Sequence, residues 1–399
     1  MIFVGDYAPG ELLTEIDLQT DFLVMNLEGP IANGTLTAQT KKNFHTKKVG
    51  PILYSSNWPD YSGQIIYTLA NNHFMDLGTE LARQNTYEIQ ESNNLHTGHS
   101  SIPSEDDDRI LRFKYKGLML GILAVTENQH GIATADTEGV NGLGNWIFPA
   151  IEAVRETVDY LIVASHAGAE DSPVPLPYFQ NLYREFVNCG ADLVVGHHSH
   201  IPQGFEKFQN GYIFYGLGNF AVDPSRWRSN IEPNLNLISL AVELDFKKGR
   251  PSIQTYPLIQ SFDNEGKYKI RRADHDHRVA RYIELCNMFV VDAALRDDFW
   301  RYFASFLFKI HSGPMLSEFS KIQPHSWIRN LIHRLLCGEQ DEPTFRELAN
   351  IRSKHILECE SHIEVAKIAL SQPDYYRKKP RESENELVKE IISFLPNHN

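Results

Sequence analysis

The stretch DLVVGHHSH, residues 192–200, places three histidines directly after a short apolar run. Residues 192–196 have the length and composition of a buried strand, which predicts that the chain leaves a sheet near Gly196. His198 and His200 are two residues apart and follow this predicted strand end. Two imidazoles at that spacing can approach the same ion or pair of ions, so the stretch indicates a metal site at a sheet edge.

The same arrangement recurs along the first half of the chain. Short apolar runs at 2–5, 22–27, 64–70 and 160–164 are each followed by side chains that can bind metal. The carboxyl ends of strands in an open α/β sheet form the usual ligand site, so these residues are expected to converge. Each one alone reads equally well as a turn residue or helix cap; their joint occurrence favours a centre of oxygen and imidazole donors without thiolates. The residues concerned are Asp6, Glu28, Asn72, His166, and the histidines of 197–200.

The order of predicted elements indicates an α/β layered domain followed by helices. Further strands are expected at 118–125 and 212–215, helices at about 77–91, 149–158 and 175–189, and a terminal hairpin over 235–246 and 252–260. After residue 265 glycine becomes scarce and the periodicity turns helical, with helices expected over 277–310, 317–336, 343–371 and 382–395. We therefore predict two domains, 1–265 and a helical module, 266–399.

Composition excludes several classes of protein. The 399 residues carry a formal net charge of −13, which argues against a nucleic acid as main partner. Four scattered cysteines support neither a thiolate zinc site nor a disulfide scaffold. No segment approaches the ~18 apolar residues of a membrane helix. The predicted strand directly after Met1 leaves no room for a leader or anchor, so we expect a soluble, cytoplasmic protein.

The motif series resembles a known family. It comprises GD at 5–6, NLEGP at 26–30, ANNH at 70–73, HAG at 166–168, GADL at 190–193, GHHSH at 196–200 and LGNF at 217–220. These motifs are similar to those of CapA-type proteins, which are associated with poly-γ-glutamate capsule synthesis and sit within the calcineurin-like metallophosphoesterase superfamily. The resemblance spans about residues 1–260. It implies a four-layer α/β/β/α sandwich with a dinuclear metal centre.

The resemblance also implies a role for each residue. Glu28 would bridge two metals, with Asn72, His166 and one histidine of 197–200 on one metal, and Asp6 with another histidine on the second. His198 and His200 are favoured, with His197 as the alternative. His73 would be the catalytic histidine and Asp76 would orient it. The cofactor would be one or two divalent transition metals, manganese, iron or zinc.

Two departures from the superfamily pattern bear on the metal sites, and the loss of a donor is expected to weaken the first of them. The usual Asp-x-His of the first strand is Asp6-Tyr7-Ala8 here, so an imidazole is missing. Glu28 stands where the superfamily usually has an aspartate, a replacement typical of the CapA-type branch. The centre could therefore hold one metal or two.

Three functions fit this pattern. The first is a phosphoesterase-type hydrolase that uses a metal-activated hydroxide on a small anionic substrate. The second is a γ-glutamyl amide hydrolase or transferase, or another poly-γ-glutamate capsule biosynthesis protein; the third is a non-enzymatic assembly factor. Side chains expected to contact the substrate are Asn71, Glu170, Asn219 and Lys42, the last in a lysine-rich loop that could equally be a solvated charge run.

The helical module is expected to shape substrate access or to form a homo-oligomer, because its apolar periodicity needs a partner surface. We expect it to contribute no metal ligand. Its metal-like stretch DHDH, 274–277, is flanked by arginines and is predicted to be an exposed helix start.

Overall fold

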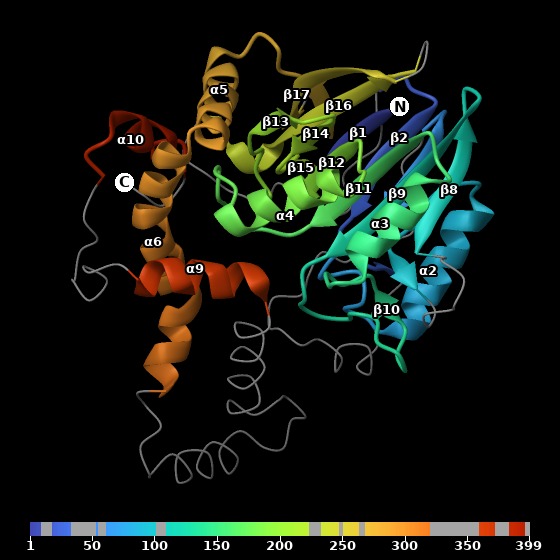
Figure 1. The fold of residues 1–399 in the computed structure, drawn as a ribbon, viewed down its shortest axis with the longest axis horizontal. Coiled ribbons are helices and arrows are strands. Elements are labelled where there is room, and N and C mark those ends of the chain that lie inside the picture. The colour runs from blue at the N-terminus through green and yellow to red at the C-terminus, as the bar shows by residue number, and fades with distance from the viewer. Residues whose placement is uncertain are drawn as a thin grey trace.

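Two mixed β-sheets form the centre of the α/β part of the protein (Figure 1). The computed structural model describes residues 1–8, 18–32, 53–54, 61–100, 109–222, 233–246, 250–262, 268–319, 359–371 and 383–395. The first sheet has the order β18-β17-β16-β1-β2-β5-β6, with β15 also paired to β1. Its strands are β1 (Ile2–Ala8), β2 (Phe22–Leu27), β5 (Gln64–Thr68), β6 (Leu95–Thr97), β15 (Asn219–Val222), β16 (Ile238–Asp245), β17 (Ser252–Phe262) and β18 (Tyr268–Arg272).

The second sheet has the order β13-β14-β12-β11-β9-β8. Its strands are β8 (Ile110–Tyr115), β9 (Leu118–Thr126), β11 (Tyr160–His166), β12 (Leu193–His197), β13 (Phe205–Phe208) and β14 (Gly211–Phe214). Two short pairs lie outside the sheets, β3 (Ile31–Ala32) with β4 (Leu53–Tyr54), and β7 (His99–Ser100) with β10 (Gly139–Val140).

The central strands are buried on both faces, which explains their nearly continuous apolar sequence. In β9, Leu120, Ile122 and Ala124 belong to the core shared with the first sheet. Leu123 and Val125 alternate with them and belong to the core under the helices. The two cores therefore lie on opposite faces of the second sheet, as the side-chain period of two requires.

Helices cover the sandwich from outside. Among the described helices, α2 (Thr79–Glu91) packs against β3 and β6, while α3 (Ile147–Arg155) and α4 (Pro177–Asn188) pack against β11, β12 and β14 (Figure 1). The predicted α/β/β/α sandwich is confirmed. Helix α3 begins earlier than expected because Pro149 fits within a first helical turn, where its missing N–H has no partner to lose.

Parallel pairing aligns the strand ends that matter. Strands β1, β2, β5 and β6 run parallel, and so do β9, β11, β12 and β14. Strand β15 is also parallel to β1, and the Asp6 amide donates to the carbonyl of Gly218 at 2.9 Å. A Cβ on Gly5 would lie 1.7 Å from that same oxygen, so only glycine allows this approach.

The segment after residue 272 is helical where it is described, as expected. It contains α5 (His277–Val291), α6 (Ala293–Phe319), α9 (Glu360–Leu370) and α10 (Glu386–Ile392), and Figure 1 shows α9 lying across α6. The buried side chains of α5 and α6 share a core with α3 and α4. The Tyr282 hydroxyl of α5 donates to the Pro202 carbonyl at 2.6 Å.

Strand β18 lies beyond residue 265, so the sheet extends into the segment expected to be helical. The division into two domains stays a prediction. Residues 317–319 of the helix expected over 317–336 form the end of α6. The rest of that helix and most of the one expected over 343–371 lie outside the described residues. Asp276 caps α5 through the amides of Arg278 and Val279, so the exposed helix start predicted for 274–277 is confirmed. No helix within the described ranges is long and apolar enough to cross a bilayer.

Candidate metal centre

Six of the predicted ligands lie together at the carboxyl ends of five strands. They come from β1, from the turn after β2, from the loop after β5, from the end of β11 and from the turn after β12, and each is at most 8% exposed. The six are Asp6, Glu28, Asn72, His166, His198 and His200.

The first group of ligand atoms surrounds the Nε2 atom of His166. This nitrogen lies 3.0 Å from Asn72 Oδ1, 3.0 Å from His198 Nδ1 and 3.8 Å from Glu28 Oε1. Glu28, His166 and His198 offer one ligand atom each within 4.8 Å of one another. This spacing suits three or four ligands around one ion.

A second group shares Glu28 with the first. It consists of Asp6, Glu28 and His200, again with ligand atoms within 4.8 Å of one another. His200 Nε2 lies 3.6 Å from Glu28 Oε1, and His200 Nδ1 lies 3.6 Å from Asp6 Oδ2. Glu28 is thus placed where a carboxylate could serve two ions.

The backbone of the HxH turn is strained at both histidines. His198 has φ 75° and His200 has φ 58°, both in the left-handed region. Such a conformation costs about 1–3 kcal/mol at a residue other than glycine and concentrates at functional sites. His197 has no such strain; its Nδ1 lies 3.1 Å from Asp6 Oδ1, and it belongs to neither ligand group above.

Two buried carboxylate oxygens of this centre lack hydrogen-bond donors among the described residues. The first is Asp6 Oδ2, which belongs to the second ligand group. The other is Glu28 Oε1, which lies beside the histidines of both groups. Buried acceptors without donors are rare and costly, so a cation is the partner that these oxygens need. The oxygen and imidazole donors without thiolate fit a divalent transition metal.

The electrostatics of the centre agree with this fit. Burial and the charge of Asp6 raise the pKa of Glu28 well above its ordinary value. Burial alone would raise the pKa of Asp6, but the imidazoles of His197 and His200 outweigh it and lower that pKa. Burial and the neighbouring histidines lower the pKa of His166 well below its ordinary value, so its imidazole is neutral, as a ligand must be.

Asparagine side chains hold the ligands in place. Asn26 Nδ2 lies 2.8 Å from Asp6 Oδ1 and 3.1 Å from His166 Nδ1. Asn219 Oδ1 lies 3.1 Å from His200 Nδ1, so this residue lies beside the centre as predicted. Asn71 is fully buried and binds the Leu27 carbonyl and the amides of residues 73 and 74. These internal bonds use both ends of the side-chain amide, and the contact of Asn71 with substrate stays a prediction.

His73 lies at the more open side of the centre. Its side chain is 27% exposed, and its Nδ1 lies 2.8 Å from Asp76 Oδ2. Burial opposes protonation, but the hydrogen bond and charge of Asp76 outweigh it and raise the pKa of His73. Glu170 lies at the rim, 41% exposed, with Oε1 3.9 Å from His198 Nε2. Lys42 lies outside the described residues.

One residue of the centre was missed from the sequence. Glu127 follows β9 directly, is fully buried, and places Oε1 2.9 Å from His198 Nε2. Burial opposes its ionisation, but the hydrogen bond and charge of His198 outweigh it, so the pKa of Glu127 is lowered. The strand-end rule that identified the ligands would have identified Glu127 as well, because residues 118–125 were predicted as a strand.

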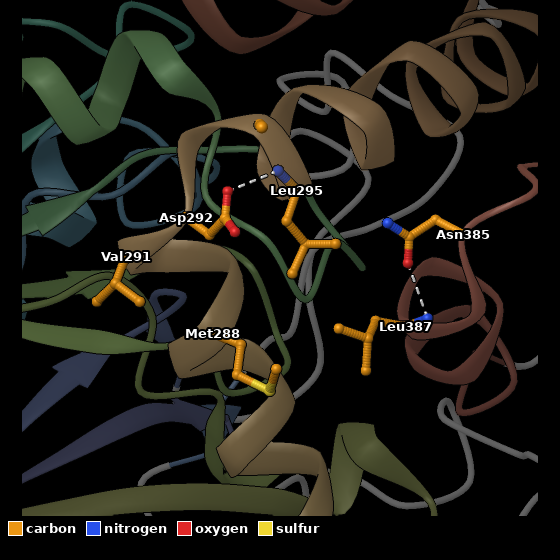
Figure 2. Close-up of a pocket in the computed structure, with 7 residues that line it drawn as sticks. Met288, Val291, Asp292, Leu295, Asn385 and Leu387 are labelled. Atoms are coloured by element: carbon orange, nitrogen blue, oxygen red, sulfur yellow. Dashed lines mark hydrogen bonds between the residues drawn. The ribbon is translucent and has the colours of Figure 1, made fainter.

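The helical segment holds a cavity of about 410 Å³ that does not belong to this centre (Figure 2). Its polar side chains serve as helix caps, since Asp292 accepts from the Leu295 amide and Asn385 from the Leu387 amide. A much smaller cavity adjoins the metal centre between α6 and α9, lined by Ala169, Glu170, His198, Leu307, Ser361, His362 and Val365.

Comparison with known proteins places the α/β part in a family. The family model described as bacterial capsule synthesis protein PGA_cap matches residues 5–224. The chain is 27% identical over 243 residues to PGA biosynthesis protein CapA of Bacillus subtilis (strain 168), covering 55% of this chain and 62% of that protein. It is 26% identical over 223 residues to capsule biosynthesis protein CapA of Bacillus anthracis, covering 52% of this chain and 53% of that one.

The chain thus spans between half and two thirds of the length of these relatives. Among solved structures, a hypothetical protein from Thermus thermophilus aligns with a TM-score of 0.36 at 17% identity, over 64% of this chain and 98% of that one. Since the family model covers more than half of the chain, the protein belongs to the PGA_cap family of bacterial capsule synthesis proteins, within the metallophosphoesterase-like superfamily.

Proposed function

We propose that the protein is a metal-dependent hydrolase that cleaves a phosphoester in a small anionic substrate. The observation that carries this proposal is Glu28, whose Oε1 faces both ligand groups and accepts no hydrogen bond from the described residues. A carboxylate in that position fits two neighbouring divalent ions. Bound metal would supply Lewis acidity and lower the pKa of water to the neutral range.

The ligand residues hold the ions, and the neighbouring polar residues orient the ligands. Asp6 and His200 would serve one ion, and Asn72, His166 and His198 the other, with Glu28 common to both. Asn26 fixes Asp6 and His166 at once, and Asn219 holds His200. Burial of the whole set keeps competing water away from the ligand atoms.

His73 would handle the proton. Asp76 holds Nδ1 of its ring at 2.8 Å, so Nε2 is the nitrogen left to exchange a proton with the leaving oxygen. The partial exposure of His73, in contrast to the buried ligands, supports a position where substrate can reach it.

A second candidate uses the same centre on a γ-glutamyl amide bond. The names of the two Bacillus relatives support a link with capsule polymer synthesis. The chain spans only 62% and 53% of the length of these relatives, so the role of the whole protein is a proposal. Two further points are proposals as well: that the ion is manganese, iron or zinc, and that the protein self-associates through residues 266–399.

The deciding experiment compares the two substrate classes on one preparation. Protein loaded with Mn²⁺, Fe²⁺ or Zn²⁺ is assayed against phosphomonoesters, phosphodiesters and γ-glutamyl peptides, with chelator-treated protein as control. We expect metal-dependent release of phosphate or alcohol from a phosphoester. Metal-dependent cleavage of the peptides alone would transfer the proposal to the second candidate, and metal binding with no turnover on either class would contradict both.

A further inference from the structure

Helix α9 begins beside the metal centre, although it lies more than 150 residues beyond the last predicted ligand. Its second residue, Ser361, donates from its backbone amide to Glu127 Oε2 at 3.1 Å and from its hydroxyl to Glu127 Oε1 at 3.2 Å. Glu127 Oε1 also lies 2.9 Å from His198 Nε2. One buried carboxylate therefore joins a predicted metal ligand to the first turn of α9.

A second contact runs alongside the first. The Asn128 amide donates to Glu360 Oε2 at 2.7 Å, and the Asn128 side chain also donates to that carboxylate. The pairs 127–128 and 360–361 thus interlock at the start of α9. The carboxylate of Glu127 also occupies the end of an 11-residue helix where unpaired amides favour negative charge.

The geometry of His198 gives this link a consequence for metal binding. Its Nδ1 faces His166 Nε2 within the first ligand group, while its Nε2 faces Glu127. A carboxylate on the far nitrogen of a ligating histidine fixes the ring orientation and holds the proton on that nitrogen. Gln129 supports Glu127 in this position, with Nε2 2.6 Å from Glu127 Oε1.

We propose that Glu127 is a positioning residue that couples docking of α9 to metal binding at the centre. A docked α9 holds Glu127 where it orients His198, and a bound metal holds His198 where it retains Glu127 and α9. The proposal rests on metal binding in the proposed function, and not on hydrolysis. Coupling of this kind is reciprocal, so any factor gained in metal affinity appears equally in the docking equilibrium.

The test uses two variants that break the link from opposite sides. Glu127→Gln keeps the shape but removes the charge that faces His198, and Ser361→Asp places a second carboxylate against Glu127. Lys367→Ala is the matched control, because Lys367 is an exposed residue of the same helix. Dissociation constants for Mn²⁺ and Zn²⁺ are measured by chelator competition, and amide hydrogen exchange over 360–370 is followed with and without metal.

We expect both variants to bind metal about 10–100-fold more weakly, the usual loss on removing such a partner of a ligating histidine. Metal should slow exchange over 360–370 by a similar factor in the unaltered protein and in Lys367→Ala, and not in either variant. The proposal would be overturned if Glu127→Gln bound metal with an unchanged dissociation constant. It would also be overturned if amide hydrogen exchange over 360–370 in the unaltered protein were the same with and without metal.

The remaining outcomes are also decisive. If Lys367→Ala weakens metal binding as much as Ser361→Asp, general loosening of the helix explains the effect and the coupling is wrong. If no metal binds at all, both the coupling and the proposed function are overturned. If metal binds with the expected coupling but no substrate is hydrolysed, only the proposed function fails.

Discussion

Replacement of Glu28 by glutamine tests the centre most directly, because the residue belongs to both ligand groups. Glutamine keeps the size of the side chain and removes its charge. Metal at 100 times its dissociation constant stabilises a protein by about 2.7 kcal/mol. If the variant binds 100-fold more weakly, the same metal concentration contributes only about 0.4 kcal/mol.

The corresponding shift in melting temperature follows from the size of the unfolding unit. At about 2.1 cal/mol/K per residue, unfolding of all 399 residues together gives a metal-induced rise of about 3 °C, and unfolding of 1–265 alone gives about 5 °C. In Glu28→Gln the rise should stay below about 1 °C. Without metal, the variant should be about as stable as the unaltered protein, because burial and the charge of Asp6 raise the pKa of Glu28 and so already disfavour the charge that glutamine removes.

Differential scanning calorimetry with chelator or with added Mn²⁺ measures both quantities. Glu152→Gln on the exposed face of α3 is the matched control and should keep the full metal-induced rise. A rise in Glu28→Gln equal to that of the control would refute the shared-ligand assignment. A large loss of stability without metal would instead show that Glu28 supports the fold.

Three further predictions concern other parts of the chain. His73→Ala should keep its metal, measured by elemental analysis, while turnover falls by roughly 10²–10⁴; loss of metal would make His73 a ligand. Gly5→Ala should destabilise the fold by about 3 kcal/mol or more in denaturant titration, because its Cβ meets the Gly218 carbonyl, and a smaller loss would mean that β15 shifts easily. Burial lowers the pKa of the His96 imidazole to about 4, so the unfolded chain takes up a proton at this histidine at a higher pH than the folded protein does. The free energy of unfolding should therefore fall by up to about 3 kcal/mol as the pH drops from 6.5 to 4, and His96→Gln should flatten that slope.

The sequence predicted the central strands and the convergence of the ligands for a clear physical reason. Strands buried on both faces leave continuous apolar runs, and parallel order brings their carboxyl ends to one edge. Strands at the sheet edges were harder to predict. Strand β8 carries Arg112 and Lys114 on its exposed face, and β18 ends in Arg271 and Arg272, so neither reads as an apolar run.

The connection to α9 could not be predicted from local pattern. Glu127 and Ser361 are 234 residues apart, and nothing in the periodicity of either segment indicates the other. The left-handed backbone conformation of His198 and His200 could not be predicted from the sequence either, because non-glycine residues adopt it only when the surrounding structure holds them there. Those two features decide how the histidines are oriented, whereas the sequence predicted only that they are present.

The position of α9 late in the chain bears on how the protein is made. During synthesis the last predicted ligand, His200, is complete about 160 residues before Ser361, which corresponds to roughly 8–30 s at 5–20 residues per second. Throughout that interval the growing chain can present every predicted ligand while Glu127 still lacks its partner on α9. In the finished protein the same ligands are at most 8% exposed. Metal that binds before the C-terminal helices are made is therefore expected to be held weakly at first, and to leave slowly once α9 has docked against Glu127.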